Sequence, residues 1–295
     1  MTKYLVLIIF LLLAKLTSAQ LTSSYAMKLI AEAESYVFKS QFNADSDKIF
    51  YLSNSSKKFQ LIEFDLLNDS INHISDFKSP VLDFEVHPVT KNFLIVANDT
   101  SYQLIDNAGN QLKENKLNNR NAIFLQPAFN SNGNLLAFLG KMNPQDAFSL
   151  MTYDFKYDNL NQHFKHSENA NEPDWSPKSD YLSYHEFNPI SNSSLIQIVG
   201  WDGHPLFQIK SDTVKLSNAN WGVSSTKFVC VAANDYFYYI FVLRTDGQHV
   251  ETVLKSKFPL SDPDWSPDGK KISVTVSPIR GLKQLWIIDL EKNTD

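Results

Sequence analysis

The sequence is first informative through what is scarce in it. It holds one cysteine, Cys230, so it can form neither an intrachain disulfide nor a metal site built on cysteines. Its nine glycines fall in neither a G-x-x-x-x-G-K nor a G-x-G-x-x-G pattern, so nucleotide cradles have no support. The net charge is −5 and there is no run of lysine or arginine, which argues against a nucleic-acid partner. The 295 residues, 43% apolar, suffice for one large core or two ordinary ones.

The first nineteen residues have the composition of an export signal. Lys3 supplies a positive start, residues 4–14 form an apolar run, and Thr17, Ser18 and Ala19 make a small-residue exit before Gln20. An anchoring helix is the alternative, but the run is shorter than the roughly 20 apolar residues that span a bilayer. We therefore expect a cleaved signal peptide at residues 1–19 and a periplasmic or secreted mature chain with no transmembrane segment. Cys230 lies in an apolar strand-like run, which predicts a buried, unreactive thiol.

A repeat of about 44 residues covers the rest of the chain. The stretch from Pro173 to Leu182 recurs from Pro263 to Ile272, each with a tryptophan, a Ser-Pro turn and an apolar residue seven positions after the tryptophan. Applied to the whole chain, this pattern finds four weaker copies. The six anchor residues are Phe42, Val86, Phe129, Trp175, Trp221 and Trp265. Such a period predicts one supersecondary unit per repeat.

Each repeat contains turn residues after its anchor, then short β-prone runs, the second of which ends near an acid. Four short strands per unit of this length are typical of a propeller blade. The sixth unit lacks a fourth strand, and residues 27–31 before the first anchor have no unit of their own. We expect this segment to pair with the last blade and close the ring, although a short amphipathic helix is the alternative. The predicted fold is an all-β, six-bladed propeller over residues 20–295.

The units W-S-P-D-G-K-K-I at 265–272 and W-S-P-K-S-D-Y-L at 175–182 resemble the WD40-like (PD40) repeat of the TolB family. The resemblance covers residues 36–295, with two specific units and four degenerate ones. It implies a six-bladed, exported binding scaffold, whose first strand in each blade lies innermost. Some propellers of this repeat class are lyases that hold a metal with histidines near the axis.

The residues one and three positions before each anchor are mostly polar. The −1 series, one residue before the anchors, is Gln41, Glu85, Ala128, Asp174, Asn220 and Asp264. The −3 series is Lys39, Asp83, Gln126, Glu172, Asn218 and Asp262. Six of these twelve residues are acids and one is a base. If the strand is innermost, both series share one face and surround the axis.

From these series we predict an acidic collar at one mouth of the channel, able to concentrate cations or basic peptide segments. Its candidate binding residues are Asp83, Glu85, Glu172, Asp174, Asp262, Asp264, Asn218 and Asn220. The alternative for Asp174 and Asp264 is structural, as acceptors for turn amides of their own or the next blade. The anchors Trp175, Trp221 and Trp265 are expected to pack between blades rather than to form an aromatic cage.

The function predicted is a monomeric, non-catalytic scaffold that binds a protein or peptide of the cell envelope, because no G-x-S-x-G or H-E-x-x-H motif is present. No cofactor is expected, although a divalent cation at the channel mouth is compatible with the collar. The alternative function is a metal-dependent carbohydrate lyase or hydrolase. His87, beside an anchor, and His185 are its weak candidate ligands, and it requires at least three ligand side chains at the axis.

Overall fold

The structure is a computed structural model. It describes residues 20–33, 37–54, 59–77, 81–97, 101–112, 123–143, 145–164, 170–188, 190–191 and 193–293. The predicted signal peptide at residues 1–19 lies outside this part of the chain. No helix of the described residues has both the length and the hydropathy needed to cross a membrane.

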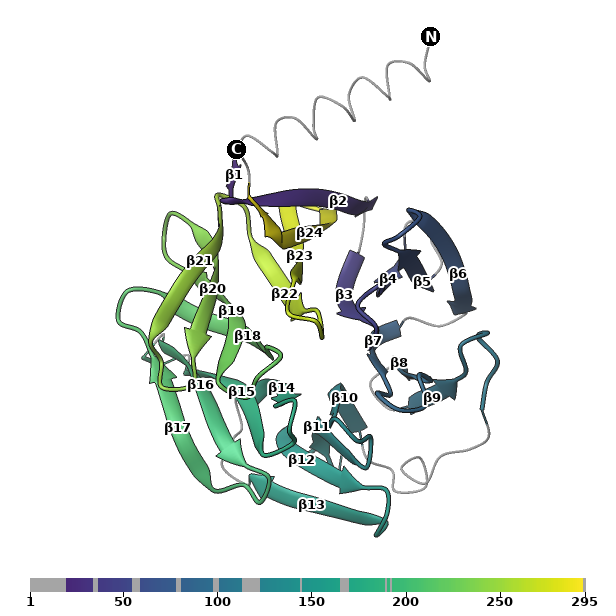
Figure 1. The fold of residues 1–295 in the computed structure, drawn as a ribbon. Helices are drawn as coiled ribbons and strands as arrows, with labels where there is room; N and C mark the ends of the chain where they lie inside the picture. Colours follow the sequence, from purple (N-terminus) through teal and green to yellow (C-terminus); the bar gives the residue numbers. More distant parts are fainter. Residues whose placement is uncertain are drawn as a thin grey trace.

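Six antiparallel sheets surround a central axis, as predicted (Figure 1). Blade 1 contains β3 (Val37–Phe42), β4 (Lys48–Ser53), β5 (Phe59–Asp65) and β6 (Ser70–Phe77). Blade 2 contains β7 (Val81–Val86), β8 (Phe93–Ala97) and β9 (Ser101–Ile105). Blade 3 contains β10 (Ile123–Phe129), β11 (Leu135–Lys141), β12 (Ser149–Asp154) and β13 (Asn159–Phe164).

Blade 4 contains β14 (Ala170–Trp175), β15 (Tyr181–Asn188), β16 (Ser193–Gly200) and β17 (Pro205–Lys210). Blade 5 contains β18 (Lys215–Trp221), β19 (Lys227–Ala233), β20 (Tyr238–Arg244), β21 (His249–Ser256) and the short β1 (Leu21–Thr22). Blade 6 contains β22 (Leu260–Trp265), β23 (Lys271–Ile279), β24 (Leu282–Asn293) and β2 (Tyr25–Ala33).

The first strand of each blade lies nearest the axis, and its anchor is its last residue (Figure 1). We call β3, β7, β10, β14, β18 and β22 the inner strands. Because successive strands of a blade run antiparallel, the short turns that follow the anchors all lie on one side of the ring, the turn face. The connections between blades lie on the opposite side, the loop face.

The ring closes through the N-terminal segment, which confirms the strand prediction and excludes the helical alternative. Strand β2 is the outermost strand of blade 6 and pairs antiparallel with β24, with Met27 opposite Ile288 and Leu29 opposite Trp286. The segment before it also pairs with blade 5, because Leu21 lies opposite Ser256 in β21. The N-terminal segment therefore joins the two blades that end the chain.

Two blades differ from the expected four strands. Blade 5 has five strands because β1 pairs with its outermost strand, β21. The sequence did not predict this strand, since two residues are too few to show a strand pattern. In the described residues blade 2 has three, followed by a single bridge between Ile105 and Gln111. Residues 113–122, which follow that bridge, lie outside the described part of the chain.

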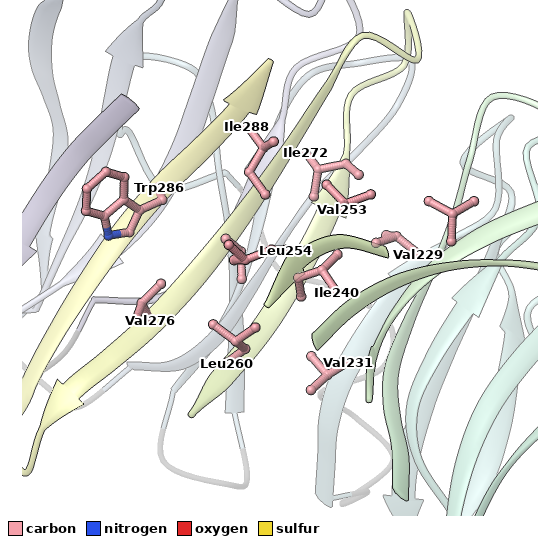
Figure 2. Close-up of a cluster of buried hydrophobic side chains, with 12 residues drawn as sticks. Val229, Val231, Ile240, Val253, Leu254, Leu260, Ile272, Val276, Trp286 and Ile288 are labelled. Carbon is pink, nitrogen blue, oxygen red and sulfur yellow. The ribbon is translucent and has the colours of Figure 1, made fainter. Parts of the chain in front are cut away.

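The core is divided among the six seams between blades. One cluster of buried apolar side chains fills each seam, and Figure 2 shows the cluster between blades 5 and 6. Every anchor belongs to the seam with the preceding blade: Trp221, for example, lies 5% exposed between blades 4 and 5. Burying each large anchor contributes on the order of 2 kcal/mol, so the repeated aromatic positions hold the ring together. Cys230 is fully buried in the same seam, and burial raises the pKa of its thiol.

Gly133 sits where the ring of His87 leaves no room for a side chain. Its φ is +72°, and a Cβ there would lie 2.2 Å from Cε1 of His87. We expect Gly133→Ala to lower the free energy of unfolding by about 2 to 3 kcal/mol, because it adds a steric clash to the left-handed backbone cost. Gly203→Ala, at a φ of +87°, is the matched control for the backbone cost alone and should lose about 1 kcal/mol. Urea unfolding of both variants measures the difference, and equal losses would show that His87 yields without cost.

Candidate functional site

Each inner strand is interrupted by a bulge before its anchor. The pairing with the second strand shifts there in all six blades, for example between Asn171 and Asp174 in blade 4. Five of the six −3 residues adopt positive φ: Lys39, Gln126, Glu172, Asn218 and Asp262. Proline occupies the −2 position in three blades, where no ladder hydrogen bond is needed. The bulge changes the direction of the −3 side chain. A positive φ is unfavourable for a residue other than glycine, so contacts with the rest of the ring must hold these five residues in that conformation.

The −1 and −3 residues of all six inner strands line one axial cavity of about 340 Å³. All eight candidate binding residues named from the sequence are among its lining residues: Asp83, Glu85, Glu172, Asp174, Asp262, Asp264, Asn218 and Asn220. So are Lys39, Gln41 and Gln126, which belong to the same two series but were not among the candidates. Their position in the series was the available signal.

The −1 side chains connect neighbouring blades. Five of the six accept a hydrogen bond from the backbone N–H of the next anchor: Asp174 Oδ2 from Trp221 at 2.8 Å, Asn220 Oδ1 from Trp265 at 2.9 Å, and Asp264 Oδ2 from Phe42 at 2.7 Å. Gln41 and Glu85 do the same for Val86 and Phe129. Ala128 has no such group, so the seam between blades 3 and 4 lacks this contact. Asp174 and Asp264 thus have the structural role that was the alternative to binding, although the donor is an anchor amide rather than a turn amide.

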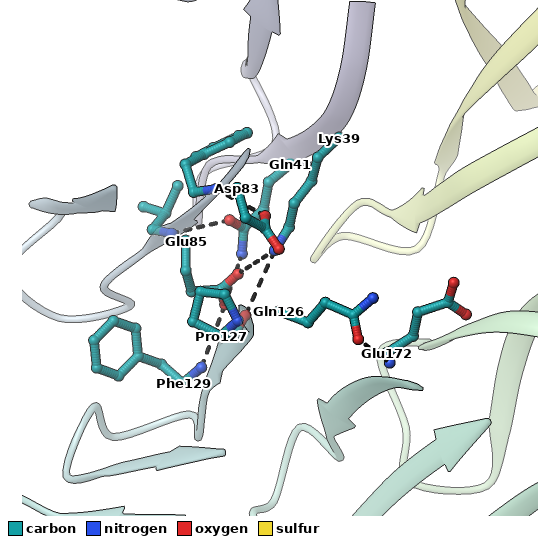
Figure 3. Close-up of polar contacts among 10 residues, drawn as sticks. Lys39, Gln41, Asp83, Glu85, Gln126, Pro127, Phe129 and Glu172 are labelled. Carbon is teal, nitrogen blue, oxygen red and sulfur yellow. Dashed lines mark hydrogen bonds and ion pairs between the residues drawn. The ribbon is translucent and has the colours of Figure 1, made fainter. Parts of the chain in front are cut away.

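The −3 residues form two different arrangements along the cavity wall (Figure 3). Lys39 Nζ lies 2.9 Å from Asp83 Oδ1 and 3.3 Å from Glu85 Oε2. Gln126 Oε1 accepts the N–H of Glu172 at 2.7 Å, and Glu172 Oε2 accepts the N–H of Asn218 at 2.7 Å. One lysine therefore neutralises the acids of blade 2. No ion pair within the described residues does so for Glu172, Asp174, Asp262 or Asp264.

The pKa values of the cavity's acids depend on burial and on whether Lys39 lies beside them. Burial raises the pKa of Glu172 and of Asp174 to about 7, and that of Asp264 to about 8, with neighbouring carboxylates adding to the effect. Burial also raises the pKa of Asp83 and of Glu85, against the opposing charge of Lys39. Burial alone would lower the pKa of Lys39, but Asp83 and Glu85 outweigh it and hold that pKa above its usual range. Near neutral pH, Glu172, Asp174 and Asp264 are therefore partly protonated. A cation bound beside them would favour their ionised forms.

The two histidine candidates do not converge with the cavity. His87 follows an anchor and closes its turn, with Nδ1 accepting the N–H groups of Val89 at 3.2 Å and Thr90 at 3.1 Å. His185 lies on β15, where Nε2 is buried without a hydrogen-bond partner and burial lowers the ring's pKa to about 4. Over the described residues, no three His, Cys, Asp or Glu side chains are grouped so that they could hold a metal ion.

Comparison with known proteins gives the fold and one short sequence match. No family model matches the chain. A stretch of 53 residues, 18% of the chain, is 42% identical to the Tol-Pal system protein TolB of Xylella fastidiosa and 40% identical to that of Xanthomonas campestris. The match spans 12% of the length of these relatives.

Solved structures match over nearly the whole chain. A putative TolB from Agrobacterium tumefaciens superposes with a TM-score of 0.66 at 14% identity, covering 91% of this chain and 96% of that one. An oligogalacturonate lyase in complex with manganese gives 0.61 at 11% identity, covering 91% and 94%. A calcium-binding regucalcin from Agrobacterium tumefaciens gives 0.60 at 13% identity, covering 91% and 96%. The fold is a TolB-like six-bladed β-propeller, and folds of this kind serve proteins of different activity.

Proposed function

We propose that the mature chain is an exported scaffold, periplasmic or secreted, that binds a basic segment of a protein or peptide partner in its axial cavity without chemistry of its own. The observation that carries this proposal is the convergence of six acids and a single lysine on one cavity of about 340 Å³. A low-dielectric wall around an excess of acidic groups favours a bound cation in the cavity. The TolB sequence match and the predicted signal peptide support an envelope setting.

The basic group has a preferred side of the cavity. Lys39 already occupies the side of Asp83 and Glu85, so an incoming ammonium or guanidinium group gains most beside Glu172 and Asp262. These two acids belong to the −3 series and are free of the anchor contacts that engage Asp174 and Asp264. A divalent cation would compete for the same carboxylates. The metal-dependent lyase alternative has no comparable observation in its favour.

The test is binding of fluorescein-labelled acetyl-tetralysine to the mature protein, followed by anisotropy. We expect Glu172→Gln with Asp262→Asn to weaken binding at least tenfold, because neither side chain can then ionise beside a bound cation. The glutamine still offers an oxygen to the N–H of Asn218, as Glu172 does. Binding should also weaken with rising salt and be displaced by Ca²⁺. Labelled tetraglutamate should not bind.

The matched control is Asp212→Asn with Asp235→Asn, which removes the same charge from two exposed positions that do not line the cavity. Its affinity for tetralysine should stay within twofold of the unaltered protein. Equal losses in the two double variants would mean that tetralysine responds to net charge alone, and the axial site would be rejected. No loss in either would reject it as well.

A further inference from the structure

A second, larger cavity of about 700 Å³ opens on the turn face between blades 1 and 2. Its apolar lining includes Phe42, Phe50, Ile74 and Phe93, and the rings of Phe50 and Phe93 meet edge to face with centroids 4.9 Å apart. Prolines from the turns of three blades extend it towards the axis: Pro88, Pro177 and Pro267. We call this cavity the crevice. Its size and apolar lining are those of a ligand-binding cavity.

Four of the five Asp, Glu and Lys residues that line the crevice form ion pairs, and the fifth, Asp47, accepts a hydrogen bond from Asn43 Nδ2. Lys91 of blade 2 lies 3.0 Å from Asp45 of blade 1, and Lys48 lies 2.9 Å from Glu63 within blade 1. All four side chains line the crevice. A charged ligand group would have to displace one of these partners, whereas an uncharged apolar or aromatic group would enter at no such cost. The crevice therefore favours a neutral apolar group.

The crevice and the acidic axial cavity have one lining residue in common. Gln41 lines both cavities. Its Oε1 accepts the N–H of Val86 at 2.9 Å, and its Nε2 donates to Glu85 Oε1 at 3.3 Å. The two cavities, one apolar and one lined mainly by acidic and amide side chains, thus adjoin at Gln41, within reach of a single extended ligand.

We infer that the partner segment carries an apolar residue, preferably aromatic, within about three residues of its basic residue, and that the crevice binds this side chain. Three extended residues span about 10 Å, which suits two cavities that adjoin at Gln41. A flexible peptide can present a basic side chain to the axial cavity and an apolar side chain to the crevice at this spacing. The inference rests on the proposed function of the axial cavity and adds the second element of its ligand.

The experiment uses acetyl-tetralysine peptides extended by glycine and serine, with one phenylalanine placed one, two, three or four residues after the last lysine. The same peptides with alanine or glutamate in place of phenylalanine are the ligand controls. We expect phenylalanine to raise affinity about tenfold over alanine at one or more spacings, and glutamate to give no gain. The mature protein and two variants are measured by anisotropy.

The first variant, Asn72→Trp, fills the crevice from an exposed lining position on β6. It should remove the gain from phenylalanine while leaving the alanine peptides unchanged. The second, Asn159→Trp, makes the same change at an exposed position on β13, away from the crevice, and should keep the gain. Thermal unfolding of Asn72→Trp within 3 °C of the unaltered protein establishes that the variant is folded; Asn72→Phe replaces it otherwise.

The outcomes separate the two proposals. If alanine and phenylalanine peptides bind equally tightly, the inference about the crevice is wrong and the axial site stands. If the gain from phenylalanine survives in the crevice-filling variant, the aromatic group binds elsewhere and the inference is again wrong. If no lysine peptide binds, the proposed function and the inference fall together.

Discussion

Thermal unfolding of the propeller, residues 20–295, is expected to move to higher temperature when the pH is lowered from 8 to about 5. In the folded state the pKa of Glu172 and Asp174 is about 7 and that of Asp264 about 8, above the ordinary values of 4.5 and 3.8. A carboxyl group whose pKa is higher in the folded than in the unfolded state binds its proton more tightly when the protein is folded. Its protonation therefore stabilises the fold at low pH, and this stabilisation is lost as the pH rises through the folded-state pKa. We expect a gain of about 2 to 4 kcal/mol at pH 5 over pH 8, or roughly 5 to 10 °C.

His185 acts in the opposite direction and reduces this gain. Because its folded-state pKa is lowered to about 4, the unfolded chain takes up a proton below about pH 6.5 that the folded chain does not. Stability from this group therefore falls as pH drops from 6.5 to 4. Because one histidine opposes three carboxyl groups, the rise in melting temperature between pH 6.5 and 5 should be smaller than the carboxyl groups alone would give, without changing sign.

Asparagine substitutions test the cause of the pH dependence. Asp174→Asn and Asp264→Asn keep an acceptor oxygen for the next anchor amide, as Asn220 does naturally in blade 5, but cannot ionise. The double variant should lose more than half of the difference in melting temperature between pH 8 and pH 5, measured by circular dichroism. Asp212→Asn with Asp235→Asn should retain it. A melting temperature of the unaltered protein that rises from pH 5 to 8 would contradict the assignment of these carboxyls as protonated near neutrality.

Deletion of residues 20–33 from the mature chain is expected to have the largest effect on stability. It removes β2 from blade 6 and β1 from blade 5, and it uncovers the apolar side chains that Met27 and Leu29 pack against. We expect the melting temperature to fall by more than about 10 °C, because several buried apolar side chains lose their partners. The edge of β24 would then be free to pair with another chain, so the deleted protein should also self-associate.

Scanning calorimetry and light scattering measure the two parts of this prediction. Lys28→Ala is the control: it alters β2 through an exposed ion pair with Asp69 and a cation–π contact with Phe64, and should change stability by about 1 kcal/mol or less. A deleted protein that melts like the full chain and stays monomeric would show that the ring does not depend on its N-terminal strand. Added β2 peptide should partly restore the melting temperature.

The fold could be predicted from the sequence because each of the six repeats shows the same pattern of anchor, turn and strands. Trp175 and Trp265 fix the period, and the apolar residue seven positions later locates the second strand even where the anchor is Val86. The strand at Met27 followed from counting strands, since the sixth repeat lacked one. Strand β1 did not follow, because two residues are too few to show a strand pattern and their partners in β21 lie more than 230 residues away in the chain.

The site was less predictable than the fold. The two polar series identified the lining of the cavity, but the hydrogen bond from Trp221 to Asp174 joins different repeats, and no local pattern encodes it. The positive φ at Lys39 and Glu172 was hidden because the usual marker of that conformation, glycine, is absent there. The crevice arises from side chains of two blades, such as Phe50 and Phe93, whose proximity depends on the angle between sheets.

The pairing of β2 with β24 also orders events in time. Glu32 and Gln284, hydrogen-bonded across this pair, are 252 residues apart in the chain. A ribosome therefore finishes the sixth repeat before the earliest strand meets its neighbour, and contacts of such long range form slowly. During that interval the ring stays open between its first and last blades.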